Sequence, residues 1–176
     1  MNDEFATECW GEYKLGDLFH FEPTKGVDST LLVDGCDVPY IGAKHDAEGV
    51  IKMCAATDNQ EYISEGNCIV FIMLGAGSAG YANYVKDAFI GMTGKTIAGY
   101  LKWREMTENI GLFLETVLCL ERPKYSFGRS WSGDRLLNTV IKLPKIWGVS
   151  LVDWDFMDKT IESYRYDLKQ RLESVL

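Results

Sequence analysis

The C-terminal part of the chain alternates apolar and polar residues with the period of an α-helix. Between residues 153 and 176 the apolar positions are spaced by threes and fours, as on one face of a helix. They are Met157, Ile161, Tyr164, Leu168, Leu172 and Val175. A helix of this length measures about 35 Å at roughly 1.5 Å per residue. Its apolar stripe can pack on its own domain or pair with a second helix. Because nothing follows it in the sequence, we expect that second helix to come from another molecule.

The residues before this helix contain short apolar or alternating stretches that are typical of β-strands. Residues 67–74 are continuously apolar after Asn67 and rich in β-branched side chains, which predicts a buried central strand. Residues 107–121 have helical spacing, with Thr107 as the expected N-cap. Further strands are predicted at 38–41, 49–55, 81–85, within 89–100 and at 136–143, with a short helix or turn at 13–21. The pattern indicates an α/β mixture in which short strands outnumber helices.

The composition is that of one globular domain in a reducing compartment. A chain of 176 residues with 47% hydrophobic content can bury one core. The five cysteines are an odd number without a C-x-x-C pair, and His20 and His45 lack the spacing of a metal pair, so we expect free thiols and no metal site. The apolar runs are too short to cross a bilayer, and no signal peptide opens the sequence. We therefore expect a cytoplasmic protein without a membrane partner.

The charge is unevenly distributed along the chain. The net charge is −8, but residues 1–65 carry 4 basic and 14 acidic groups, whereas residues 86–145 carry 10 basic and 6 acidic groups. Binding to DNA depends on the field at the contact surface, which salt screens beyond about 8 to 10 Å. An acidic first third is therefore compatible with a basic DNA-binding face, although it predicts weak non-specific binding of DNA by the isolated chain.

Two glycine motifs raise the possibility of nucleotide binding. Residues 75–80 match G-x-G-x-x-G and follow a predicted strand, as in dinucleotide-binding folds. However, residues 81–85 alternate like a strand instead of opening a helix, and residues 88–104 contain no acid for a ribose hydroxyl. Gly94-Lys95-Thr96 resembles the end of a P-loop, but Phe89 stands where its first glycine belongs. A tight hairpin at 75–80 is the favoured interpretation, with a nucleotide-dependent enzyme as a weaker alternative.

The segment 124–135 combines basic, aromatic and hydroxyl residues between a predicted helix and a predicted strand. Arginine can pair with guanine edges, and lysine and serine can contact phosphate. The alternative is that Tyr125 and Phe127 belong to the core and that the cations are merely solvated. Lys44-His45 forms a weaker second loop of the same kind. The candidate DNA-binding residues are Lys44, His45, Lys95, Lys124, Tyr125, Arg129, Trp131 and Arg135.

The sequence contains no self-sufficient catalytic constellation. It lacks a Ser/His/Asp order with a nucleophile elbow and an H-E-x-x-H motif, and its acids show no spacing that defines a metal or glycosidase site. We therefore predict no catalytic residue, no metal ligand and no cofactor on this chain.

Six segments follow one another in an order that covers nearly the whole chain. They are Trp10-x-x-Tyr13-Lys14-Leu15-Gly16-Asp17-Leu18-Phe19, Val38-Pro39-Tyr40-Ile41 with Glu48-Gly49-Val50, Gly75-x-Gly77-x-x-Gly80-Tyr81-x-x-Tyr84, Lys124-Tyr125-Ser126-Phe127-Gly128-Arg129, Ile141-x-Leu143-Pro144 and Asp153-Trp154-x-Phe156-Met157. Together they resemble the target-recognition domain of restriction–modification specificity (S) subunits. The sequence departs from that pattern at 148–152, where Val152 stands in place of a proline.

The resemblance implies an α+β-like recognition domain over residues 1–152, with a curved, mostly antiparallel or mixed sheet that reads a few base pairs of double-stranded DNA. Residues 153–176 would form a coiled-coil spacer helix. Typical S subunits carry two such domains and bind a DNA methyltransferase subunit and, in some systems, a restriction subunit. A chain with one domain would be a half-length subunit that forms a homodimer through its helix, or half of a longer subunit. S-adenosylmethionine would bind to the partner.

A different class of function stays open at this point. The acidity of residues 1–65 is also typical of a protein-interaction module that mimics DNA and binds or inhibits such enzymes. A DNA mimic would bind the methyltransferase subunit and would never bind duplex DNA, even in the assembled complex.

Overall fold

Two four-stranded sheets and a two-stranded ribbon form the body of the computed structural model, which describes residues 9–125 and 128–174. The strands are β1 (Trp10–Lys14), β2 (Phe19–Pro23), β3 (Asp34–Ile41), β4 (Val50–Cys54), β5 (Ile63–Ser64), β6 (Cys68–Ile72), β7 (Ala82–Val85), β8 (Phe89–Gly91), β9 (Thr96–Leu101) and β10 (Val140–Pro144). The α-helices are α1 (Leu15–Leu18), α2 (Glu108–Leu120), α3 (Asp134–Leu137) and α4 (Trp154–Glu173).

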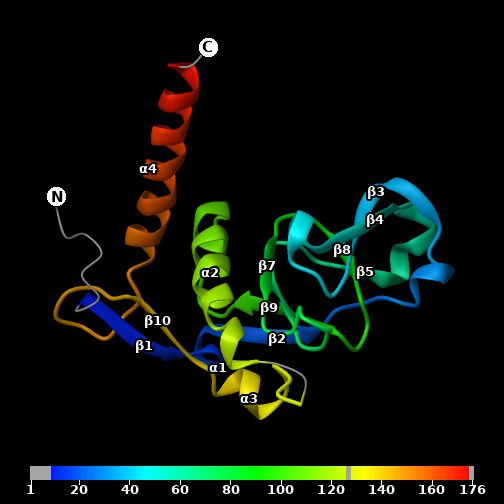
Figure 1. Cartoon of the computed structure of the whole chain (residues 1–176), viewed down its shortest axis with the longest axis horizontal. Helices are drawn as coiled ribbons and strands as arrows, with labels where there is room; N and C mark the ends of the chain where they lie inside the picture. The colour runs from blue at the N-terminus through cyan, green and yellow to red at the C-terminus, as the bar shows by residue number, and fades with distance from the viewer. Residues whose placement is uncertain (1–8, 126–127, 175–176) are drawn as a thin grey trace.

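The strands are arranged in one antiparallel sheet, one mixed sheet and the ribbon. The antiparallel sheet has the order β2-β9-β6-β7, and β1 pairs with β10 in the ribbon. The second sheet has the order β4-β3-β8-β5, in which β3 and β8 are parallel. In Figure 1 this second sheet lies on the far side of the molecule from α4, with α2 between them. The expected α/β fold with antiparallel and mixed pairing is therefore confirmed.

Strand β6 is buried on both of its faces. Ile69 and Phe71 belong to the main core, which also contains the buried face of α2. Val70 points to the other side, into a smaller cluster with Ile41 and Phe89 of the second sheet. Because both faces are covered, every residue of β6 is apolar, which confirms the buried central strand predicted from the sequence.

Helix α2 begins where the sequence predicts it. The side chain of Thr107 accepts a hydrogen bond from the Ile110 amide at 3.2 Å, so Thr107 is the N-cap. The buried side chains of the helix recur at helical spacing and face the antiparallel sheet.

Two local predictions differ from the structure. The short helix or turn predicted within 13–21 is present as α1, but it is limited to residues 15–18, because β1 ends at Lys14 and β2 begins at Phe19. The strand predicted at 136–143 begins only at Val140, because residues 134–137 form α3. The Asn138 amide donates to the Asp134 carbonyl at 2.9 Å, which closes the helical turn and leaves no strand at 136–139. An apolar run of this length fits either element until its neighbours are known.

The first third of α4 is anchored to the domain. Its N-cap is Asp153, whose carboxylate accepts from the Phe156 amide at 3.0 Å. Met157 is fully buried in the main core, and the Asp158 carboxylate accepts from the Thr107 hydroxyl at 2.7 Å. Arg165 then forms an ion pair with Glu108 of α2. Met157 is therefore a core residue and cannot contact a partner, contrary to the predicted seam.

Beyond this anchor, α4 projects away from the sheets (Figure 1). Ile161 is partly buried against the core, whereas Tyr164, Leu168 and Leu172 are 58 to 60% exposed. Val175, the last position of the predicted stripe, lies outside the described residues. The first part of the apolar stripe thus packs against the domain, and the later part is exposed to solvent. No helix in residues 9–125 and 128–174 is long and apolar enough to cross a membrane.

Candidate nucleic-acid interface

Loops that are far apart in the sequence meet at one end of the antiparallel sheet, where β6 ends and β9 begins. The Met73 amide donates to the Lys95 carbonyl at 2.8 Å, and the Met73 carbonyl accepts from the Trp131 amide at 3.3 Å. The chain after Gly128 and the turn before β9 therefore lie on either side of Met73. Residues 43–46 line a hollow of about 460 Å³ together with residues 76–78 and Tyr81, which follow Met73 in the chain. This end of the sheet thus brings together three of the predicted segments.

The glycine motif forms a tight turn between β6 and β7. The Gly80 amide donates to the Ile72 carbonyl at 3.0 Å, and Gly77 and Gly80 have φ angles of +79° and +94°. A Cβ at position 80 would come within 2.9 Å of the Tyr125 side chain, so only glycine fits there. The turn leads into strand β7 and not into a helix, so it lacks the helix N-terminus that binds the pyrophosphate in dinucleotide folds. The hairpin interpretation is confirmed.

Ring contacts at Tyr81 join the loop at 43–46 to the glycine turn. The rings of His45 and Tyr81 are parallel within 1°, with centroids 4.5 Å apart. The guanidinium carbon of Arg122 lies 4.8 Å from the centre of the Tyr81 ring. The Tyr81 ring thus contacts both the imidazole and the guanidinium, and these contacts form a stack at Tyr81. Arg122 also donates to the Gly77 carbonyl at 2.8 Å, so the stack fixes the geometry of both loops.

Arg122 is not among the binding residues predicted from the sequence. It lies two residues before the segment 124–135, in the short turn after α2, and is followed by Pro123. Residues 77 and 81 lie far from Arg122 in the sequence, so the sequence alone does not indicate that Arg122 contacts them. The only signal was its closeness to the basic segment.

Tyr125 and Trp131 are core residues, and this corrects their assignment to the DNA-binding surface. Trp131 has no exposed surface, and its ring packs against Tyr125 at 4.7 Å and edge-on to Phe71 at 5.0 Å. The Trp131 Nε1–H donates to the Thr139 hydroxyl at 3.1 Å, and the Tyr125 hydroxyl lies 2.7 Å from the same oxygen. Burial raises the pKa of the Tyr125 phenol. The two aromatic side chains are buried in the core under the loop and are therefore not available to contact DNA. Phe127 lies outside the described residues.

Replacement of Thr139 by valine should lower the free energy of unfolding by about 2–3 kcal/mol. The buried hydroxyl bonds Trp131 and Tyr125 and donates to the Arg135 carbonyl at 2.7 Å, so valine leaves buried polar groups without partners. Urea denaturation followed by tryptophan fluorescence measures the change. The control is Thr116→Val on the exposed side of α2, where the hydroxyl bonds only the Leu112 carbonyl and the change should be within about 0.5 kcal/mol. Equal losses in both variants would contradict this role.

The predicted cations divide into two groups. Lys95, Arg129 and Arg135 are exposed beside the end of β6, and half-buried Lys44 lies 3.5 Å from Asp46 at the hollow. Arg135 donates to the Ser130 carbonyl at 3.2 Å, which braces the loop. Lys124 lies elsewhere: it pairs with Glu121 and borders a second hollow beside β1 and β10. We therefore remove Lys124 from the candidate interface.

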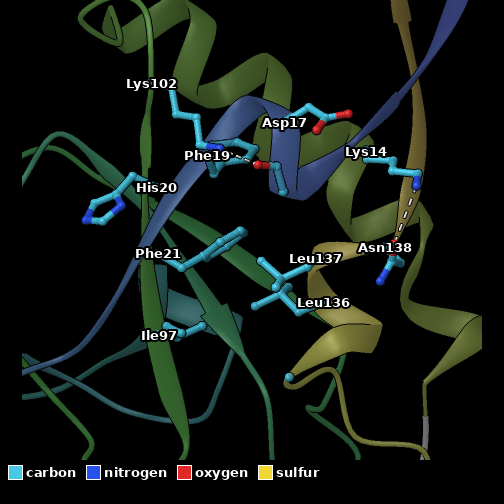
Figure 2. A pocket seen from close by; sticks show the side chains of 12 residues that line it. Lys14, Asp17, Phe19, His20, Phe21, Ile97, Lys102, Leu136, Leu137 and Asn138 are labelled. Carbon is cyan, nitrogen blue, oxygen red and sulfur yellow. Dashed lines mark hydrogen bonds between the residues drawn. The ribbon is translucent and has the colours of Figure 1, made fainter.

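A larger hollow of about 700 Å³ lies between β2, β9, α1 and α3. Figure 2 shows Phe21, Ile97, Leu136 and Leu137 gathered at its centre, with Lys14, Lys102 and His20 around them. Its lysines are already bonded within the protein, Lys102 to the Gly16 carbonyl at 2.5 Å and Lys14 to Asn138 at 3.5 Å. Among the described residues, no group of three or more His, Cys, Asp or Glu side chains could hold a metal ion.

Comparisons with known proteins agree with this architecture. The family model described as "Type I restriction modification DNA specificity domain" matches residues 7–175. Among solved structures, the S subunit of a type I restriction–modification system from M. genitalium has 19% identity and a TM-score of 0.59, over 95% of this chain and 44% of that one. The comparison with curated proteins finds no match.

Two other solved structures are similar to the same extent. The HsdS subunit from Thermoanaerobacter tengcongensis has 14% identity and a TM-score of 0.55, over 94% of this chain and 39% of that one. A chain from a structure on complex assembly and conformational transition of the type I R-M system has 14% identity and a TM-score of 0.57, over 95% and 40%. At these identities the likeness shows a shared fold. The chain spans less than half the length of each of these solved chains.

Proposed function

The chain belongs to the family of type I restriction modification DNA specificity domains, and from this premise we propose that it is the DNA-recognition part of a restriction–modification enzyme. In this proposal it binds a short tract of double-stranded DNA, performs no chemistry itself and acts in the cytoplasm. A partner DNA methyltransferase subunit, with a restriction subunit in some assemblies, acts at the site that this chain selects. In this proposal S-adenosylmethionine binds to that partner.

The observation that carries the proposal is the meeting of basic loops at one end of the antiparallel sheet. Lys95 and Arg129 are exposed there, and Lys44 and His45 border the hollow beside them. Exposed cations on neighbouring loops can contact phosphates along the DNA backbone, while an arginine among them can pair with a base edge. Buried Trp131 and the stack at Tyr81 hold these loops in fixed positions, which sequence readout requires.

The proposal is tested with the chain co-purified with its cognate methyltransferase subunit. A random duplex library incubated with the complex should yield one enriched sequence motif, whereas the methyltransferase subunit alone should enrich none. A complex that forms but never binds or selects duplex DNA would contradict the proposal. That outcome would favour the DNA-mimic alternative instead.

We further propose that the exposed end of α4 pairs with the same helix of a second copy. Tyr164, Leu168 and Leu172 present an apolar stripe to solvent, and an apolar stripe on a helix is the usual seam of a coiled coil. Two copies related by a two-fold axis would place two recognition domains on one DNA duplex, and the helix would set the spacing of the two half-sites. The fully buried Met157 takes no part in this seam.

The double substitution Leu168→Glu and Leu172→Glu should convert a dimer into a monomer, because it places four carboxylates in the seam. Light scattering after size exclusion distinguishes the monomer of 19.9 kDa from a species of twice that mass. Ser163→Glu with Gln170→Glu adds the same charge on the opposite side of the helix and should stay dimeric. A monomeric wild-type chain at all concentrations would contradict the pairing.

A further inference from the structure

The hydrogen-bond network around His45 fixes which of its ring nitrogens carries the hydrogen. Asn83 is fully buried, and its Nδ2 donates to the Lys44 carbonyl at 2.9 Å. The amide oxygen of Asn83 is therefore the atom that faces His45, and it lies 2.8 Å from Nδ1. An amide oxygen can only accept a hydrogen bond, so Nδ1 must be the donor.

Cys119 supports the same assignment. Its Sγ lies 4.0 Å from Nδ1 of His45 and donates its own hydrogen to the Ala82 carbonyl at 3.3 Å. Burial raises the pKa of this thiol, so the sulfur stays protonated and faces Nδ1 only as a weak acceptor. Two acceptors thus converge on Nδ1.

The second ring nitrogen of His45 is available to a ligand. The two ring nitrogens of an imidazole point in different directions, so Nε2 does not face buried Asn83, and His45 is one of the residues that line the hollow. Within residues 9–125 and 128–174, no side chain or backbone group forms a hydrogen bond with it. With the hydrogen on Nδ1, Nε2 of the neutral ring is an acceptor.

The ring is also held rigidly. It stacks on Tyr81, whose ring Arg122 also contacts. The loop after it follows an unusual path, with φ angles of +50° and +55° at Ala47 and Glu48. Non-glycine residues in this region are strained and persist only where the surrounding contacts fix them. The lone pair of Nε2 therefore has a defined direction.

We infer that His45 reads a base through Nε2, by accepting a hydrogen bond from an exocyclic amino group. This inference rests on the proposed function and names the chemistry of one contact. In the major groove only adenine N6 and cytosine N4 are such donors, and in the minor groove only guanine N2. Lys44 beside it can hold the phosphate backbone while the fixed imidazole selects the base edge.

The test compares the wild-type chain with His45→Phe, each bound to the cognate methyltransferase subunit in the same buffer. Phenylalanine keeps a ring that can stack on Tyr81 and removes both nitrogens. Duplexes of the selected motif carry, one position at a time, a base analogue that lacks its exocyclic amino group. The wild-type complex should lose about 5- to 100-fold in affinity at one position, and the identity of that position distinguishes adenine, cytosine and guanine.

The His45→Phe complex should bind the parent and analogue duplexes equally at that position and keep its preferences at all others. Because the ratio of two affinities does not depend on the folded fraction, a partly unfolded variant does not obscure the result. His20→Phe makes the same change at an exposed histidine outside the hollow and should behave as wild type. Unchanged discrimination by His45→Phe at every position would overturn the inference, as would a uniform loss at all positions. A wild-type complex that selects no motif would instead overturn the proposed function.

Discussion

Replacement of Trp131 by alanine should lower the free energy of unfolding by about 3–5 kcal/mol, the largest loss expected from a single substitution in this chain. The side chain has no exposed surface and packs against the rings of Phe71 and Tyr125. Its removal leaves a cavity between β6 and the basic loop and takes from Thr139 one of its hydrogen-bond donors. Because Trp131 also joins the loop to the end of β6, the substitution should loosen the proposed DNA-binding surface.

Urea denaturation followed by far-UV circular dichroism measures this effect without depending on the lost fluorophore. The matched control is Trp147→Ala, which removes the same side chain at a position that is 86% exposed. That variant should change stability by less than about 0.5 kcal/mol. A small loss for Trp131→Ala would mean that the loop after Gly128 is not part of the core.

The combined substitution of Lys44, Lys95 and Arg129 by alanine should weaken the binding of cognate duplex by about 100-fold or more. An arginine that pairs with a guanine contributes about 1–3 kcal/mol, and each lysine that neutralises a phosphate releases a counterion on binding. The logarithm of the binding constant should therefore depend less steeply on the logarithm of the salt concentration, with a slope reduced by about two, one for each lysine. Titration of a labelled duplex with the assembled complex at several salt concentrations gives both quantities.

A control triple variant with the same loss of positive charge distinguishes the effect of these three side chains from the effect of the net charge of the chain. Arg104, Lys142 and Lys159 are exposed and do not line the hollow at residues 43–46 and 76–81. Their replacement by alanine changes the net charge by the same amount and should alter affinity by less than about threefold. Similar losses in both triple variants would show that the net charge, and not this end of the sheet, determines binding.

Structural elements that depend only on residues close together in the chain were predicted correctly from the sequence. The spacing of apolar residues over 107–121 and the cap at Thr107 predict α2, because both depend on residues within one or two turns. The continuous apolar run at 67–74 predicts β6, and the alternation after the glycine motif predicts the hairpin at 75–80. The family resemblance also came from local motifs in a fixed order, and the match over residues 7–175 confirms it.

The sequence did not show which side chains of the candidate interface are exposed to solvent and which are buried. Tyr125 and Trp131 stand among basic and hydroxyl residues, which suggested a surface role, yet they are core residues because Phe71 and Thr139 pack against Trp131. Likewise, Met157 and Leu168 belong to one apolar stripe, but only the first is covered by the domain. The spacing of apolar residues identifies one face of a helix, but it does not show how much of that face the rest of the domain covers.

The local elements, the family and the segments that contribute the basic residues can all be assigned without coordinates. That Lys44, Lys95 and Arg129 share one end of a sheet, that Lys124 lies elsewhere and that Arg122 packs on Tyr81 becomes visible in the folded chain alone. These two kinds of result differ because the underlying interactions differ in range. Capping, helical spacing and turn geometry act between residues a few positions apart, whereas the interface depends on hydrogen bonds and ring contacts between segments that the sequence separates by tens of residues.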